Sequence, residues 1–367
     1  MMTLQKAMLS PAELITLQLR GLFERYGYRK YKVSQFEEYS FYLDFRSFLS
    51  EGRILSFTDL DGRLLALKPD VTLSIAKNVR MDDGARKLYY IENVYRESLA
   101  SGMMKEISQM GLECIGYSSG YAQAEVLSLA AETLGMTGTR FVLDISHMGY
   151  LQALFEELAI EGEHRVSILK ALQSKSPHMI QMAAAEAGIR EPGVAVLAQL
   201  SSLSGPFEST VSTASDLCLN QKMSLALDEL RKIARDSGCM GSLHLDFTQQ
   251  ADLEYYDGLL MSGYLEGVPR AVLSGGRYDG LMKKLGKDVH ACGFALYLDE
   301  LDWLTDRNSE MGTDVLLLDE GADAGVLLDN VKRFAGEGKR VRVEREMPRN
   351  GKFGAVYRLT REGVLTC

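Results

Sequence analysis

Two long extended runs, Leu88–Tyr95 and Gln109–Tyr117, constrain the fold more than any other feature of this 367-residue chain. A loop containing Gly and Ser joins them, so the pattern predicts a long antiparallel hairpin. A second hairpin is expected over Phe57–Leu67, because Asp61-Gly62 at its centre tolerates the positive φ of a tight turn. Consecutive hairpins with helices segregated from them favour an α+β fold over a doubly wound parallel sheet.

Helical signals flank these hairpins. Ser10-Pro11-Ala12-Glu13 is a helix start, because Ser10 suits the cap, Pro11 the first helical position and Glu13 a capping box. From about residue 148 to 238 the apolar spacing is helical and indicates a helical insertion. Strands are expected again at 242–248, 258–263 and 270–274, followed by a helix over Gly293–Leu304.

The C-terminal part of the chain has a different pattern. A strand, a helix and two further strands are expected between Thr313 and Leu359. The alternation predicts a small α/β domain over residues 313–367, separate from a core over residues 1–304.

Composition excludes several classes of function. The formal net charge is −9, and basic clusters such as Arg29-Lys30-Tyr31-Lys32 are short, so nucleic-acid binding is not expected. No apolar run is long enough for a membrane span and no signal peptide is expected, which indicates a cytoplasmic protein. The five Cys and five His residues are dispersed, without metal-ligand spacing, and no phosphate-binding glycine loop occurs, so neither a metal nor a cofactor is expected.

A set of polar residues occupies strands and turns that would otherwise face a core. Gln109 and Glu113 lie four residues apart on one predicted strand and therefore on the same face. Each residue alone is more typical of a solvated strand face or a turn. The candidates are Asp70, Thr72, Arg96, Gln109, Glu113, Tyr255, Tyr256 and Tyr278.

Taken together, the segments that carry these residues resemble the class II aminoacyl-tRNA synthetases, in their histidyl-specific form. Leu67-Lys-Pro-Asp-Val-Thr72 is similar to Leu-Arg-Pro-Glu-Gly-Thr of the histidyl enzymes. Tyr95-Arg96-Glu97 with the strand from Gln109 resembles the second class II motif. Leu253-Glu-Tyr-Tyr256 resembles the histidine-specific signature, and the stretch from Gly275 to Leu296 resembles the run into the third motif. The resemblance covers roughly residues 8–304.

The resemblance implies an antiparallel class II core and an amino-acid pocket. Asp70 and Thr72 would hold the α-ammonium group, and Arg96 and Gln109 would face the α-carboxylate. The imidazole would lie between a carboxylate, which favours the protonated ring, and aromatic side chains. These residues are Glu113 and Tyr256, with Tyr278 closing the site.

Two departures from the family pattern concern activation of the amino acid by ATP. The signature arginine that activates the reaction is replaced by Ala251, and the third motif, Gly-Phe-Ala-x-Gly-Leu-Glu-Arg in the family, reads Gly293-Phe-Ala-Leu-Tyr-Leu-Asp-Glu300 here. Loss of one positioned charge donor costs on the order of 3 kcal/mol of transition-state stabilisation. An acid in place of the second arginine adds repulsion, so loss of synthetase activity is expected.

This profile, with its short C-terminal domain, is similar to the regulatory subunits of ATP phosphoribosyltransferase, the first enzyme of histidine biosynthesis. The resemblance implies a non-catalytic chain that assembles with a short-form catalytic subunit, and histidine as a possible ligand. It also implies a homodimer through the class II core, at about residues 12–45. Two alternatives are a divergent synthetase or amino-acid ligase that uses ATP, and a histidine- or tRNA-sensing module of another pathway.

Overall fold

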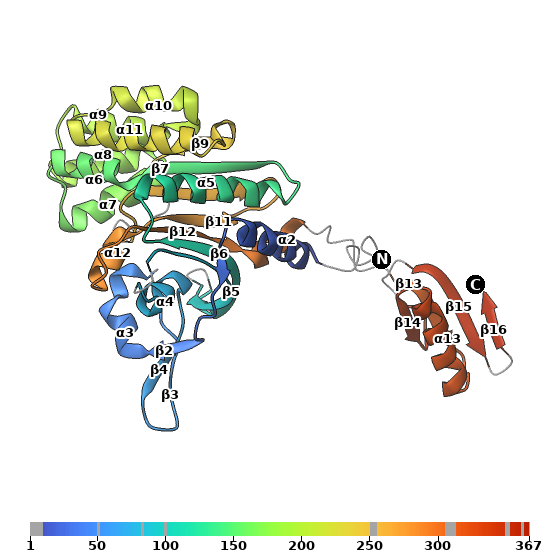
Figure 1. Cartoon of the computed structure of the whole chain (residues 1–367). Helices are drawn as coiled ribbons and strands as arrows, with labels where there is room; N and C mark the ends of the chain where they lie inside the picture. Colours follow the sequence, from blue (N-terminus) through green and yellow to red (C-terminus); the bar gives the residue numbers. More distant parts are fainter. Residues whose placement is uncertain are drawn as a thin grey trace. The chain divides into compact units, whose positions relative to one another are not determined.

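The computed structural model describes residues 10–49, 52–81, 84–98, 101–249, 255–304, 313–348, 353–360 and 363–366. The chain forms two compact units, residues 1–304 and residues 305–367 (Figure 1). Within the described ranges, no helix is both long and apolar enough to span a lipid bilayer.

A large sheet forms the centre of the larger unit. Over the described residues it contains nine strands in the order β1-β5-β6-β12-β11-β10-β7-β9-β8. Neighbouring strands are antiparallel except for β1 with β5 and β7 with β9, which confirms the predicted α+β class. The strands are β1 (Arg29–Lys30), β5 (Arg86–Glu97), β6 (Met104–Ile115), β7 (Phe141–His147), β8 (Ser204–Pro206), β9 (Leu243–Asp246), β10 (Leu259–Leu265), β11 (Leu273–Arg277) and β12 (Ala291–Tyr297).

Different helices pack against the two faces of this sheet (Figure 1). One face shares the largest hydrophobic core with α2 (Pro11–Arg25) and α5 (Ser119–Gly135). The capping box predicted at the start of α2 is confirmed. On the other face, α4 (Val71–Asn78) and α12 (Asp279–Lys284) contribute to a second hydrophobic core. Because side chains alternate along β6, Met110, Leu112 and Cys114 join the first core, whereas Ile115 joins the second.

The predicted helical insertion consists of helices stacked beyond β7 and β9 (Figure 1). It also contains the short strand β8 at Ser204–Pro206, which was not expected. Gly205 and Pro206 do not favour a helix, and they pair with β9 instead. The helices are α6 (Met148–Glu157), α7 (Gly162–Gln173), α8 (Pro177–Glu186), α9 (Gly193–Ser202), α10 (Phe207–Asp216) and α11 (Gln221–Asp236).

The predicted helix over Gly293–Leu304 was wrong in its first half. Residues Ala291–Tyr297 form β12, which is paired with β6 and β11 near the middle of the sheet, and a 3-10 helix follows at Leu298–Leu304. Small residues favour this strand pairing: a Cβ added at Gly293 would overlap the carboxyl group of Glu113. The predicted strand at 270–274 also lies later, at Leu273–Arg277.

A three-stranded sheet, β2 (Phe36–Glu38), β4 (Leu64–Leu67) and β3 (Ser56–Thr58), contains the second predicted hairpin. Gly62 in its turn has a φ of 81°, as the Asp-Gly pair predicted. Short α3 (Tyr39–Asp44) follows β2. Directly after β4, the fully buried Lys68 pairs with Glu92 of β5 at 2.6 Å. This ion pair fixes the chain where it enters the candidate site.

The smaller unit contains β13 (Thr313–Asp319), α13 (Ala324–Gly336), β14 (Val341–Glu344), β15 (Phe353–Thr360) and β16 (Gly363–Thr366). Its strand order is β14-β13-β15-β16, with β13 parallel to both neighbours. A small apolar core of Val315, Leu317, Phe334 and Leu359 holds it together. The first four elements match the expected order, and β16 was not expected.

Candidate functional site

A cavity of about 220 Å³ opens on the face of the large sheet that carries α4 and α12. The middle strands of the sheet form its floor, and the N-terminus of α4 and the Tyr255-Tyr256 segment form its walls. All eight candidate residues line this one cavity: Asp70, Thr72, Arg96, Gln109, Glu113, Tyr255, Tyr256 and Tyr278. Residues almost 210 positions apart in the sequence therefore meet in one place.

Asp70 is held from several sides at the start of α4. It is the N-cap residue, and its Oδ1 accepts a hydrogen bond from the backbone N–H of Leu73 at 2.7 Å. Its Oδ2 lies 3.2 Å from Nη2 of Arg96, and the hydroxyl of Tyr255 is 3.5 Å from Oδ1. These three contacts fix the Asp70 carboxylate in place at the lining of the cavity.

Arg96, near the end of β5, is oriented by two contacts. Its Nε donates to the carbonyl of Pro69 at 2.7 Å, and its Nη2 pairs with Asp70. Although burial lowers the pKa of Arg96, Asp70 and then Tyr297 raise it, with a net increase. Arg96 is the one cationic side chain among the described residues that line the cavity.

Glu113 lies at the bottom of the cavity, with only 1% of its surface exposed. Its Oε1 is 2.6 Å from the hydroxyl of Thr72 and its Oε2 is 2.5 Å from the hydroxyl of Tyr278. Burial raises the pKa of Glu113 to about 8, although the two hydroxyls lower it and Asp70 contributes a smaller increase. At neutral pH a Glu113 carboxyl group with this pKa is mostly protonated.

Gln109 lies on the same face of β6 as Glu113 and is 2% exposed. Opposite it on β12 is Tyr297, whose hydroxyl is 2.6 Å from Oγ of Ser274. Sequence reasoning missed Tyr297 and Ser274 as cavity residues. The available signal was that Tyr297 occupies a position where the synthetase pattern has glycine.

Three tyrosines form an aromatic side of the cavity. The ring centroids of Tyr255 and Tyr256 are 4.7 Å apart, and those of Tyr255 and Tyr278 are 6.2 Å apart. Burial raises the pKa of all three phenols well above the ordinary value, so they are neutral. They supply flat apolar surface with polar tips, which suits an aromatic heterocycle.

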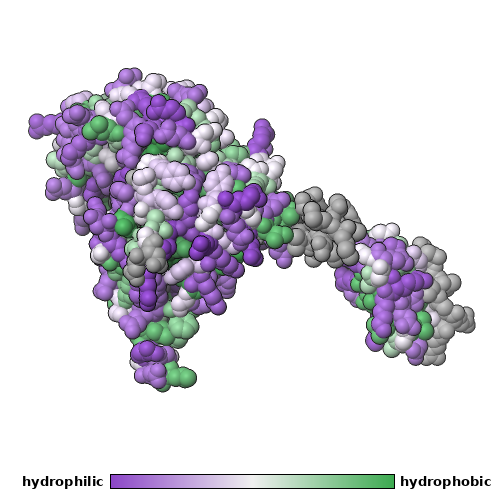
Figure 2. Space-filling model, in the orientation of Figure 1, coloured by the Kyte–Doolittle hydropathy of each residue, from purple (hydrophilic) through white to green (hydrophobic). Residues whose placement is uncertain are grey.

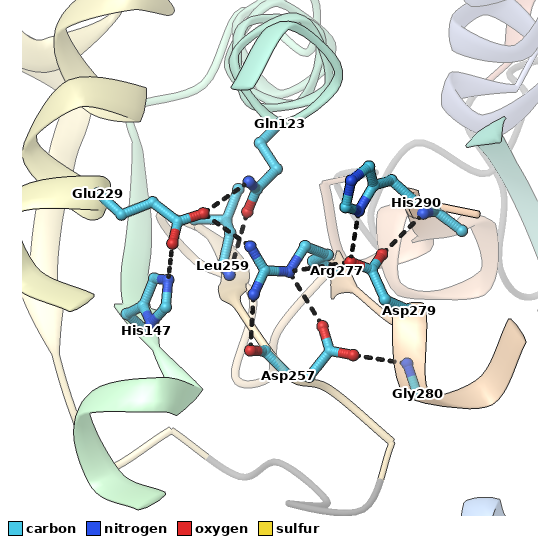
Figure 3. A network of polar contacts seen from close by, with 10 residues as sticks. Gln123, His147, Glu229, Asp257, Leu259, Arg277, Asp279, Gly280 and His290 are labelled. Atoms are coloured by element: carbon cyan, nitrogen blue, oxygen red, sulfur yellow. Dashed lines mark hydrogen bonds and ion pairs between the residues drawn. The ribbon is translucent and has the colours of Figure 1, made fainter. Parts of the chain in front are cut away.

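A network of charged residues is centred on Arg277, which directly precedes Tyr278 (Figure 3). Its Nη1 lies 2.7 Å from Glu229 on α11, and its Nε lies 3.0 Å from Asp257. His147 approaches the other oxygen of Glu229 at 3.3 Å. The contact with His147 and the charge of Arg277 lower the pKa of Glu229 to about 2, against the opposing effect of burial.

The same network reaches the backbone around the cavity. Asp257 accepts from the N–H of Gly280 at 2.5 Å, and Asp279 accepts from the N–H of Ala291 at 2.9 Å and contacts His290 at 2.8 Å. Figure 3 shows these groups surrounding Arg277. Since Tyr278 follows Arg277 directly, the network connects the tyrosine side of the cavity to the helical insertion.

Ala251 and Glu300 stand where the synthetase pattern has arginines, and the structure describes only one of these two positions. Ala251 lies outside the described residues. Glu300 lies on the 3-10 helix, does not line the cavity, and is 3.4 Å from Arg270. Over the ranges that the structure describes, no group of three or more His, Cys, Asp or Glu residues is arranged to hold a metal ion.

Comparison with known proteins agrees with this architecture. The sequence matches the histidyl-tRNA synthetase family over residues 5–301. The ATP phosphoribosyltransferase regulatory subunit of Caldanaerobacter subterraneus subsp. tengcongensis is 31% identical over 299 residues, which are 80% of this chain and 78% of that protein.

Solved structures share the fold. An ATP phosphoribosyltransferase regulatory subunit/histidyl-tRNA synthetase from Bacillus halodurans has a TM-score of 0.72 at 24% identity, over 91% of this chain and 88% of that chain. A chain of the ATP phosphoribosyl transferase (HisG:HisZ) complex from Thermotoga maritima has a TM-score of 0.61 at 19% identity, over 78% and 97%. The chain belongs to the histidyl-tRNA synthetase family and, within it, to the regulatory subunits of ATP phosphoribosyltransferase.

Proposed function

We propose that this chain is a non-catalytic regulatory subunit of ATP phosphoribosyltransferase, which activates a short-form catalytic subunit and senses histidine. One observation carries the proposal: among its described lining residues, the cavity offers the groups that an amino acid needs but a single positive side chain for the phosphates of a nucleotide. Arg96 is its one cationic side chain among the described residues, and Asp70 already pairs with it. The phosphates of ATP are typically held by several positive groups, and Arg96 is the one such side chain among the described lining residues, which supports sensing over activation.

The cavity residues suit histidine in one orientation. The α-carboxylate would meet Arg96 and the Gln109 amide, and the α-ammonium group would meet Asp70 and the oxygen of Thr72. The imidazole would contact Glu113, next to the rings of Tyr256 and Tyr278. If the ring binds as imidazolium, Glu113 releases its proton, because the nearby positive charge favours the carboxylate.

A reconstitution experiment tests the proposal. The purified chain is mixed with a short-form catalytic chain, and complex formation, the rate of phosphoribosyl transfer and inhibition by histidine are measured. We expect a complex with an enhanced rate that histidine lowers. Asp70→Ala and Glu113→Ala chains should still form the complex but lose sensitivity to histidine. Failure to associate or to change the rate contradicts the proposal.

The alternative of a divergent synthetase or ATP-dependent ligase predicts a different result. Such an enzyme would catalyse histidine-dependent ATP–pyrophosphate exchange without a partner. Exchange by the isolated chain would refute the non-catalytic role. Histidine binding by a chain that associates with no phosphoribosyltransferase would instead favour a sensing module of another pathway. A cytoplasmic location is part of the proposal, since the nucleotide substrates of such an enzyme are found there.

A homodimer through the class II core is a further part of the proposal. Apolar side chains are exposed on the predicted segment, with Leu17, Phe36 and Leu43 at 62%, 47% and 51%. Figure 2 shows hydrophobic residues at the surface of the three-stranded sheet that contains Phe36. A second copy of the chain would cover this surface.

Sedimentation analysis tests the dimer. Phe36→Glu is expected to shift the chain toward the monomer, because it places a charge in the apolar surface. Val166→Glu, at an exposed apolar position of α7 outside this surface, is the matched control and should not change the mass. Equal masses for both variants would contradict this interface.

A further inference from the structure

The position of Tyr297 limits which ligands the cavity accepts. Tyr297 ends β12 and lines the cavity, and its hydroxyl is held 2.6 Å from Oγ of Ser274 on the neighbouring strand β11. Ser262 of β10 is the register partner of Ser274 and also lines the cavity. The aromatic ring is therefore fixed beside the polar surface that continues across β11 and β10.

The register between β6 and β12 determines which residues lie at each end of the cavity floor. Glu113 is paired with Gly293, and Gln109, four residues earlier on β6, is paired with Tyr297, four residues later on β12. Four residues of a strand span roughly 13 Å. The carboxyl group of Glu113 thus lies at one end of the cavity floor, and the phenol of Tyr297 lies at the other end.

Arg96 lies toward the end of the cavity floor that contains Tyr297. Along β5, Leu88 is paired with Glu113 and Arg96 is paired with Lys105, so Arg96 lies on the same side of Glu113 as the Gln109–Tyr297 pair and beyond it. An amino acid whose side chain reaches Glu113 and whose α-carboxylate reaches Arg96 therefore points that carboxylate toward Tyr297. Any group attached to the carboxylate would have to occupy the space that the Tyr297 ring fills.

We propose that Tyr297 restricts this cavity to amino acids with a free α-carboxylate and excludes ligands extended at the carboxyl group, such as aminoacyl adenylates. This inference rests on the proposed histidine site and adds its selectivity. The synthetase pattern has glycine at this position, and a synthetase must keep room for a carboxyl group that becomes joined to AMP. A steric barrier against the wrong ligand gives selectivity without a new attractive contact.

Calorimetry with two ligands tests the proposal. One is histidine, and the other is a non-hydrolysable sulfamoyl analogue of histidyl-adenylate. For the wild type we expect binding of histidine and at least about 100-fold weaker binding of the analogue. For Tyr297→Ala we expect a histidine affinity within about threefold of wild type and a gain of at least about tenfold for the analogue.

Two control variants separate the ring from its hydrogen bond. Tyr297→Phe keeps the ring and Ser274→Ala removes only the hydroxyl partner, so neither should admit the analogue. Equal binding of both ligands by the wild type would overturn the inference. It would also be overturned if Tyr297→Ala bound histidine normally and gained nothing for the analogue.

The two proposals fail in different ways. Absence of histidine binding by the wild type would contradict the proposed ligand, and with it the selectivity built on that ligand. Normal histidine binding with no discrimination against the analogue would contradict the role of Tyr297 alone. Histidine binding by Tyr297→Ala also shows that the variant is folded.

Discussion

Replacing Glu113 with Gln is expected to change how the stability of the larger unit depends on pH. Burial raises the pKa of Glu113 to about 8 from an ordinary value of 4.5, and the hydroxyls of Thr72 and Tyr278 offset this only in part. Gln has nearly the same shape as the protonated acid and does not ionise. The substitution therefore removes the proton equilibrium and leaves the packing almost unchanged.

The sign and size of this change in the free energy of unfolding with pH follow from proton linkage. Between the two pKa values the folded chain keeps a proton that the unfolded chain has released, so folding becomes less favourable as the pH rises. One such proton changes the free energy of unfolding by about 1.4 kcal/mol per pH unit. From about pH 5 to about pH 7.5, Glu113 should lower the stability of the wild type by roughly 3 kcal/mol. Below about pH 4.5, the ordinary pKa of this carboxyl group, the contribution of Glu113 to stability is fully present.

Urea unfolding at several pH values measures this difference. Trp303 is the single tryptophan of the chain and lies in the larger unit, so its fluorescence follows that unit. We expect the Glu113→Gln variant to resemble the wild type near pH 5 and to become more stable than it as the pH rises. The difference should approach roughly 3 kcal/mol near pH 7.5.

A matched substitution controls for the other carboxyl groups. Glu208→Gln removes an exposed carboxyl on α10, outside the cavity, and its stability should follow the wild type across the pH range. If the Glu113→Gln and wild-type curves run parallel, Glu113 ionises at an ordinary pH. In that case the reasoning about its burial is refuted.

Three further substitutions test other parts of the structure. Gly293→Ala should destabilise the larger unit by about 1–3 kcal/mol and abolish histidine binding, because its Cβ would overlap the Glu113 carboxyl group; unchanged calorimetry would contradict this. Glu229→Gln should lower histidine affinity by about tenfold, because Arg277 loses a charged partner beside Tyr278; full affinity would show that the network does not support the site. Ser10→Ala should lower the free energy of unfolding by about 1 kcal/mol through loss of the α2 capping box, without affecting ligand binding.

Local signals in the sequence identified many of the secondary-structure elements. The capping box at Ser10, the positive φ at Gly62 and the long hairpin of β5 and β6 are all found in the structure. Caps, tight turns and strand alternation depend on neighbouring residues, so they are readable from a single chain. The family resemblance then supplied the eight candidate residues, which the fold brings into one cavity.

The tertiary structure decided the features that depend on distant contacts. Residues 291–297 are a strand because β6 and β11 pair with them on both sides, and nothing local distinguishes this apolar run from a helix. The raised pKa of Glu113 results from its burial, and the position of Tyr297 results from the register between β12 and β6. The sequence by itself therefore determined which residues are candidates for the proposed amino-acid site. Only the folded sheet decided their protonation, their order along the cavity and the position of Tyr297 at its end, because burial and register arise from contacts between segments far apart in the chain.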